Sequence, residues 1–141
     1  MKKNVLINVI SSQMIDGQAE NMEISVVGVL THNGEDYIIE YTEYDGDMQG
    51  CNTCVSVEGG ECVSITREGG FTTEMMLENG KRHSSLYSTP YGELTIGLYT
   101  KMVNSDMSAV GGTLEMDYTI DFNSGLVSEN SMKITVSERE I

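Results

Sequence analysis

Apolar and polar residues alternate through almost the whole chain with a period of two, and no segment sustains the 3.6-residue period of a helix. The stretch from Leu114 to Phe122 is the clearest example, because every second residue in it is apolar or aromatic. Successive side chains of a strand point to opposite faces, so this pattern gives each strand one buried face and one exposed face. The sequence therefore predicts an all-β protein.

Short turn signals separate the predicted strands. The pairs Asp16-Gly17, Asn33-Gly34 and Asn79-Gly80 suit tight hairpins, because Asn, Asp and Gly tolerate the backbone angles that such turns need. The chain's single proline, Pro90, is followed by Gly92 and predicts a rigid corner between two strands. These connections are too short for the crossovers that a parallel sheet requires.

About 8–10 strands joined in order by short turns predict one antiparallel sheet within a single domain, residues 1–141. Closure into an up-and-down β-barrel would remove the exposed edges, and a two-sheet sandwich is the alternative. Val103 to Gly112 is the least strand-like segment and predicts a loop or a helical turn, with Asn104-Ser105 as a cap. Gly28, inside a strand pattern, indicates a bend or a close backbone approach.

Charge excludes several classes of partner. The chain has 22 acidic and 8 basic residues, a net charge of −14, and the acid is spread along its length. Nucleic acids and anionic membranes require clustered Lys and Arg, so neither is expected as a partner. No apolar run reaches 18 residues, and the apolar start is broken by Asn8 without a following cleavage site. With three cysteines, an odd number, these features predict a cytoplasmic protein.

Four segments resemble the YwiB-like proteins, a bacterial family without an assigned activity. They are Glu40-Tyr41-Thr42-Glu43, Ile65-Thr66-Arg67-Glu68-Gly69, Tyr87-Ser88-Thr89-Pro90-Tyr91-Gly92 and Leu114-Glu115-Met116-Asp117-Tyr118. The likeness extends from about Lys3 to Ser137, and the segment containing the proline is its most specific part. The resemblance implies a small cytoplasmic barrel of the calycin type, like that of lipocalins, in a Firmicute-like bacterium. Calycins often bind small hydrophobic molecules, an analogy at the level of fold alone.

Polar residues interrupt the inward-facing positions of the predicted strands. Glu43 and Arg67 continue inward faces at strand ends, and buried charges need partners. The other polar or aromatic residues expected inside are Tyr41, Thr73, Ser85, Tyr87, Thr100, Tyr118, Ser128 and Asn130. In one interpretation, Glu43 and Arg67 form a structural ion pair within a hydroxyl network that closes the barrel. In the other, Arg67 holds the anionic head of a small amphiphilic ligand, with Glu43 nearby, while Tyr41, Tyr87 and Tyr118 line the pocket.

No catalytic motif is present, so a binding protein is expected rather than an enzyme; an enzyme would use Glu43 as an acid/base beside Arg67. The Cys51–Cys54 CxxC pair and Cys62 raise the question of a metal or redox site. Residues three apart on a strand point to opposite faces, so the pair could meet only if Gly50 to Cys54 forms a turn. The sequence has no second CxxC and no nearby His-x-His, so no metal and no cofactor are expected.

Apolar residues also occur at positions predicted to face outward, namely Ile10, Val27, Val29 and Ile38. Exposed apolar residues on one surface are typical of protein interfaces. They suggest a second function class, a homodimerising interaction module that uses a barrel rim or an unpaired strand edge and has an interior filled by side chains.

Overall fold

The computed structural model describes residues 2–15, 17–42, 52–59, 62–69, 72–89, 92–108, 110–122 and 125–138. Of these, residues 72, 86–89, 94, 126 and 127 are described by their backbone alone. The described chain forms ten β-strands. They are β1 (Lys2–Ile15), β2 (Gln18–Asn33), β3 (Asp36–Thr42), β4 (Asn52–Glu58), β5 (Cys62–Glu68), β6 (Thr72–Glu78), β7 (Arg82–Thr89), β8 (Gly92–Ser108), β9 (Gly111–Phe122) and β10 (Gly125–Glu138).

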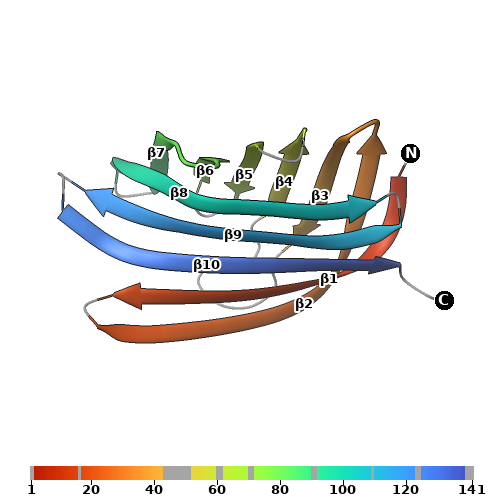
Figure 1. Cartoon of the computed structure of the whole chain (residues 1–141), viewed down its shortest axis with the longest axis horizontal. Coiled ribbons are helices and arrows are strands. Elements are labelled where there is room, and N and C mark those ends of the chain that lie inside the picture. The colour runs from red at the N-terminus through yellow and green to blue at the C-terminus, as the bar shows by residue number, and fades with distance from the viewer. Residues whose placement is uncertain are drawn as a thin grey trace.

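Each strand pairs antiparallel with its neighbours in sequence, and β1 also pairs with β10, which closes the sheet into a barrel. The predicted antiparallel up-and-down barrel is therefore confirmed. The long strands β1, β2, β8, β9 and β10 run along the length of the molecule, and the shorter strands β3 to β7 cross them steeply (Figure 1).

Glycines occupy the predicted hairpin turns in a conformation that other residues rarely adopt. Gly17, Gly34 and Gly80 have φ angles of 76°, 67° and 74°, and Gly59, which follows β4, has a φ angle of 61°. Positive φ costs glycine little because it has no Cβ. The predicted corner at Pro90 lies outside the described residues, but Thr89 stands directly opposite Gly92 across the β7–β8 pair.

Strand β8 corrects one prediction. It runs without a break from Gly92 to Ser108, so the loop or helical turn expected at Val103 to Gly112 is wrong. The pairing with β9 shifts between Thr100 and Met102, which marks a β-bulge. The bulge inserts one residue and changes the phase of the alternation, so the inward positions no longer follow the pattern that began at Leu98.

The barrel interior has an apolar half, at the end where β2 turns into β3 and β4 turns into β5 (Figure 1). Its side chains are almost completely shielded from solvent; the largest are Ile7, Leu30, Ile39, Ile65, Leu77, Leu98, Leu114, Met116 and Ile134. Side chains therefore fill this half without help from a ligand.

Gly28 allows three strands to approach closely beside this core. A Cβ at this position would lie 2.3 Å from the Glu40 carbonyl oxygen and 2.5 Å from Ile7 Cδ1. The close approach predicted from the sequence is confirmed.

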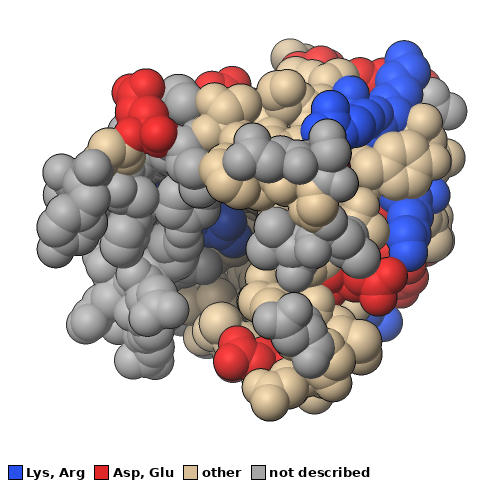
Figure 2. All heavy atoms as spheres, turned by 90° about the vertical axis from the view of Figure 1, so that its left-hand side faces the viewer, with Lys and Arg blue, Asp and Glu red and all other residues tan. Residues whose placement is uncertain are grey.

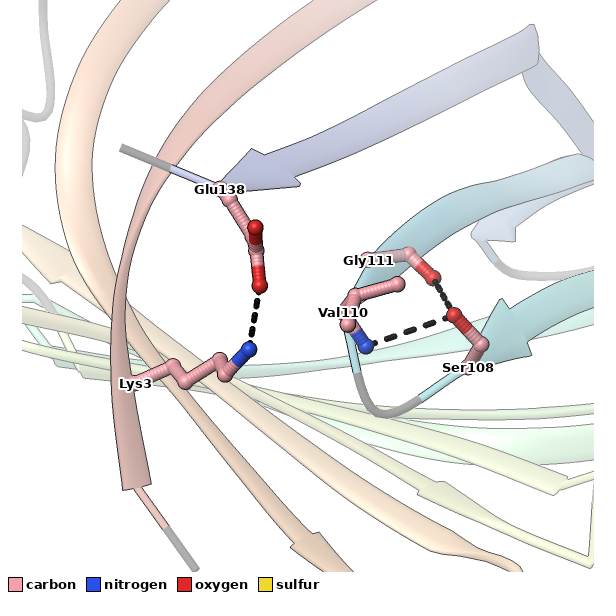
Figure 3. A network of polar contacts seen from close by, with 5 residues as sticks. All are labelled: Lys3, Ser108, Val110, Gly111 and Glu138. Carbon is pink, nitrogen blue, oxygen red and sulfur yellow. Dashed lines mark hydrogen bonds and ion pairs between the residues drawn. The ribbon is translucent and has the colours of Figure 1, made fainter. Parts of the chain in front are cut away.

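Polar contacts join neighbouring strands at the apolar end of the barrel (Figure 3). Lys3 Nζ pairs with Glu138 Oε1 and so joins β1 to β10 where the barrel closes. In the β8–β9 turn, the Ser108 hydroxyl donates to the Gly111 carbonyl over 2.9 Å, and the Val110 amide donates to the Ser108 hydroxyl over 3.3 Å.

The described residues contain no helix with the length and apolarity needed to span a membrane.

Candidate functional site

Five residues form a continuous row across the inner face of β3 to β7. In the strand register, Tyr41 stands opposite Thr53, Thr53 opposite Arg67, Arg67 opposite Thr73, and Thr73 opposite Tyr87. Directly opposed residues of an antiparallel pair have Cβ atoms about 4.5–5.5 Å apart. We call this set the arginine row. In it, Thr53 and Thr73 stand on the two sides of Arg67.

The hydroxyls of the two threonines of the arginine row are buried and have no hydrogen-bond partner among the described residues. Thr53 is 1% exposed and Thr73 is 2% exposed. Within the described part of the chain, the Oγ1 atom of each makes no hydrogen bond. A buried hydroxyl left unsatisfied costs roughly 1–3 kcal/mol. Burial of these two hydroxyls beside Arg67 therefore lowers the free energy of unfolding.

A second polar row faces the interior from β8 to β10. Thr100 stands opposite Tyr118, and Tyr118 stands opposite Asn130. All three are buried, and Asn130 Nδ2 donates to the Ser128 hydroxyl over 3.0 Å. In the described residues, the hydroxyls of Thr100 and of Ser85 on β7 also lack partners. We call Thr100, Tyr118 and Asn130 the facing row.

Electrostatics connects the two rows. Burial raises the pKa of the Tyr118 phenol above its ordinary value, and the positive charge of Arg67 opposes that rise as the weaker influence. The phenol is therefore neutral at physiological pH and can both donate and accept a hydrogen bond. The positive charge of Arg67 therefore influences the Tyr118 phenol.

The polar half of the interior opens at the end of the barrel where β1 and β9 finish. Figure 2 views this end and shows a hollow with blue atoms of a basic side chain in its depth. Among the described residues, Arg67 is the basic residue at an inward position of this half. Arg67 is partly exposed, while its Nε atom is shielded from solvent. Its side chain therefore combines a shielded Nε atom with partial exposure to solvent.

The structure brings three of the predicted site residues together, because Tyr41, Arg67 and Tyr118 all lie in the polar half. Tyr87 completes the arginine row by its backbone position, and its side chain is outside the description. Glu43 lies outside the described residues, and so does its predicted pairing with Arg67.

The other predicted inward polar residues are confirmed as buried; they are Thr73, Ser85, Thr100, Ser128 and Asn130. Thr53 was not among the predicted site residues; it lies between the two cysteines of the CxxC pair. The signal was present, since Thr53, Val55 and Val57 alternate and all three are buried.

The cysteines and histidines of the described chain have ordinary surroundings. Cys54 and Cys62 are free thiols, and burial, followed by nearby carboxylates, raises the pKa of each. Cys51 lies outside the described residues, which contain no cluster of three potential metal ligands. His32 Nε2 lies 2.6 Å from the Gly34 carbonyl oxygen, and His83 Nε2 lies 3.1 Å from Glu78 Oε1.

A groove of about 490 Å³ lies against β2 to β5, and Tyr41 and Thr53 of the arginine row are part of its lining. The acidic residues Glu40 and Glu68 also line it, and Arg67 does not. This acidic groove is unsuited to an anion, so the polar interior remains the candidate site.

Residues 7–134 match the family described as a domain of unknown function, DUF1934. The chain belongs to this family. Its fold is that of a solved structure titled "Crystal structure of ywiB protein from Bacillus subtilis", with a TM-score of 0.87 over 99% of this chain and 94% of that chain. The two sequences are 22% identical, so the likeness concerns the fold. No curated protein matches the chain.

These findings confirm the resemblance to the YwiB-like proteins and the barrel that it implied. The DUF1934 family brings no activity and no ligand with it, because its description assigns none. What the interior does must therefore be inferred from its own residues.

Proposed function

We propose that this DUF1934 protein binds a small anionic ligand in the polar half of its barrel, with Arg67 as the anchor. The observation that carries the proposal is the arginine row, in which Thr53 and Thr73 stand on both sides of Arg67 with hydroxyls that no described residue satisfies. Such a group of donors is what a carboxylate, sulfate or phosphate requires.

The chemistry of the row supports an oxyanion head group. A guanidinium binds a carboxylate or phosphate through two parallel N–H···O bonds, and hydroxyls on both sides can donate to the remaining oxygens. Binding would also satisfy the polar atoms of Thr53 and Thr73, so part of the folding cost would be recovered in the complex. The neutral phenol of Tyr118 and the amide of Asn130 can bind polar groups on the other side of the ligand.

The filled apolar half favours a compact ligand. Ile39, Ile65 and Leu98 are at most 1% exposed, which leaves no room for a long chain beyond the polar half. An amphiphile would have to keep its tail toward the open end of the barrel. The proposal therefore favours small acids and phosphate or sulfate esters over lipids.

Simple oxyanions test the proposal. Thermal unfolding of the full chain would be measured with increasing sulfate, inorganic phosphate or acetate, each against chloride at equal ionic strength. A ligand that binds only the native state raises the melting temperature with its concentration. We expect at least one oxyanion to do so.

Substitutions separate the site from general ion effects. Arg67→Met should abolish the rise, and Arg67→Lys should reduce it while keeping the charge. Arg82→Met removes a matched arginine that binds Asp121 through a 2.6 Å hydrogen bond on the outer surface, and it should leave the rise unchanged. An equal rise in the Arg67→Met variant, or no rise with any oxyanion, would contradict the proposal.

Native mass spectrometry offers an independent readout. Protein purified gently from its host should carry a small acidic molecule, and the Arg67→Met protein should not. The mass of the adduct would then identify the ligand class.

A further inference from the structure

The outer face of β10, β1 and β2 carries an apolar stripe. On β1, the side chains of Leu6, Ile10 and Met14 are 47%, 45% and 46% exposed. Val27 on β2 stands opposite Leu6 and is 44% exposed. We call these four residues the outer stripe.

Two of the four residues predicted to form an interface, Ile10 and Val27, belong to the outer stripe. The other two, Val29 and Ile38, are partly buried. Asn8 and Ser12 lie between the apolar residues of β1 on this face, and Leu6 and Val27 are direct neighbours. Exposed apolar side chains gathered on one face are typical of interaction surfaces.

The central strand of this face is free of charge, although the chain as a whole carries −14. The flanking strands carry Lys133, Glu129 and Glu23, and Lys133 Nζ lies 3.7 Å from Glu115 Oε1 of β9. The outward positions of β1 from Asn4 to Met14 hold no ionisable side chain. Ile10 lies at the centre of the stripe, with Lys133 of β10 directly opposite on one side and Glu23 of β2 on the other. Two acidic molecules repel one another over most of their surfaces, so they can approach at lowest cost where the acid is sparse.

We propose that the outer stripe is the interface of a homodimer whose two-fold axis runs parallel to β1. Rotation about this axis places each β10 residue over the β2 residue of the same row in the second copy. Lys133 then meets Glu23 of the second copy, and symmetry makes this contact twice. The apolar residues of β1 face their own counterparts between these two ion pairs.

The charge pattern favours a two-fold axis along β1 over an axis that also lies in the interface but runs across the strands. An axis across the strands through Ile10 would place Lys133 over Lys133 and Glu23 over Glu23. With the axis along β1, no acid meets an acid in the remaining rows, which pair Ser137 with Val27, Thr135 with Ser25, Ser131 with Asn21 and Glu129 with Ala19.

The size of the face indicates a weak dimer. Rows from Leu6 to Met14 on three strands cover about 30 Å by about 14 Å. A standard interface buries about 800 Å² on each partner, so we expect a dissociation constant in the micromolar range. Sheets packed face to face lie at about −30°, so the contacts should be closest around Ile10.

Sedimentation equilibrium of the full chain, from about 10 µM to about 1 mM, would measure the dimer. Lys133→Glu and Glu23→Lys should each weaken association at least about tenfold, because each places like charges in contact twice. The double variant keeps the net charge, exchanges the two partners and should return to within about threefold of the natural protein. Lys81→Glu is the control, since it changes the charge as Lys133→Glu does but lies on another surface.

A natural protein that stays monomeric across this range would overturn the interface. So would single variants that dimerise normally, or a double variant that remains dissociated. The Arg67→Met protein should dimerise like the natural one, because the outer stripe is independent of the interior site.

Discussion

At the scale of single residues, the barrel retains polar groups where apolar ones would be more stable. Thr53 and Thr73 are buried beside Arg67 with hydroxyls that no described residue satisfies. Valine has nearly the same shape as threonine and has no polar atom to desolvate. Stability alone would favour valine at both positions, which supports the proposed role of the two threonines in binding.

Thr53→Val and Thr73→Val should therefore each raise the free energy of unfolding by about 1 kcal/mol. Each should also reduce the stabilisation that the effective oxyanion produces in the natural protein. Urea unfolding with and without that anion measures both effects. Thr95→Val, at an exposed position of β8, is the control and should change stability by less than about 0.5 kcal/mol. Loss of stability in both buried variants would show that the hydroxyls are satisfied in the native state.

Tyr118 predicts a pH dependence. Its pKa is raised in the folded protein, mainly by burial, so the unfolded chain loses this phenol proton at lower pH than the native state. The stabilisation is complete below the unfolded pKa of about 10 and is lost as pH rises toward the folded value. The free energy of unfolding should thus fall above about pH 10, and Tyr118→Phe should show a smaller fall. Urea unfolding between about pH 8 and pH 11 measures this difference; equal slopes for both proteins would contradict it.

At the scale of strands, the sequence predicted most elements because alternation and glycine turns are local signals. It failed in β8, where the bulge after Thr100 moves Val103 and Met107 out of the phase set by Leu98. A bulge is stabilised by contacts with the partner strand, and those contacts are not visible in the strand's own pattern.

Gly28 shows how one residue fixes the spacing of three strands. Gly28→Ala would place a Cβ 2.3 Å from a carbonyl oxygen of β3, and backbone there cannot move without breaking the ladder. We expect the free energy of unfolding to fall by at least about 2 kcal/mol. Gly125→Ala is the matched control, because a Cβ at Gly125 would lie 3.5 Å from the Phe122 carbonyl oxygen, an ordinary van der Waals distance. Denaturant unfolding would compare them, and equal stability of the two variants would show that β2 can shift.

At the scale of the whole molecule, the site depends on register around the closed barrel. Alternation could predict that Arg67 points inward, but not that Thr53 and Thr73 are its neighbours. That placement follows from the lengths of the β4–β5 and β5–β6 connections, which set which residues stand opposite. Closure of β1 on β10 then sets the facing row across the interior. Inward residue types were therefore predictable, while their assembly into a site was not.

Net charge is also a property of the whole molecule, and it should limit stability. With −14 overall, acid repels acid across the compact state, and unfolding relieves that repulsion. The ion pairs that join described residues, such as Lys81–Glu78 and Lys101–Glu129, involve partly exposed side chains and contribute little each. Screening should thus weaken the repulsion more than it weakens the pairs.

The melting temperature should therefore rise by several degrees between about 10 mM and about 500 mM sodium chloride, as the Debye length falls from about 30 Å toward about 4 Å. Calorimetry would measure the rise, and potassium chloride should reproduce it because screening depends on ionic strength. A melting temperature that falls with salt would mean that the ion pairs outweigh the repulsion. The same screening should strengthen association through the outer stripe, since two copies that each carry −14 must approach one another.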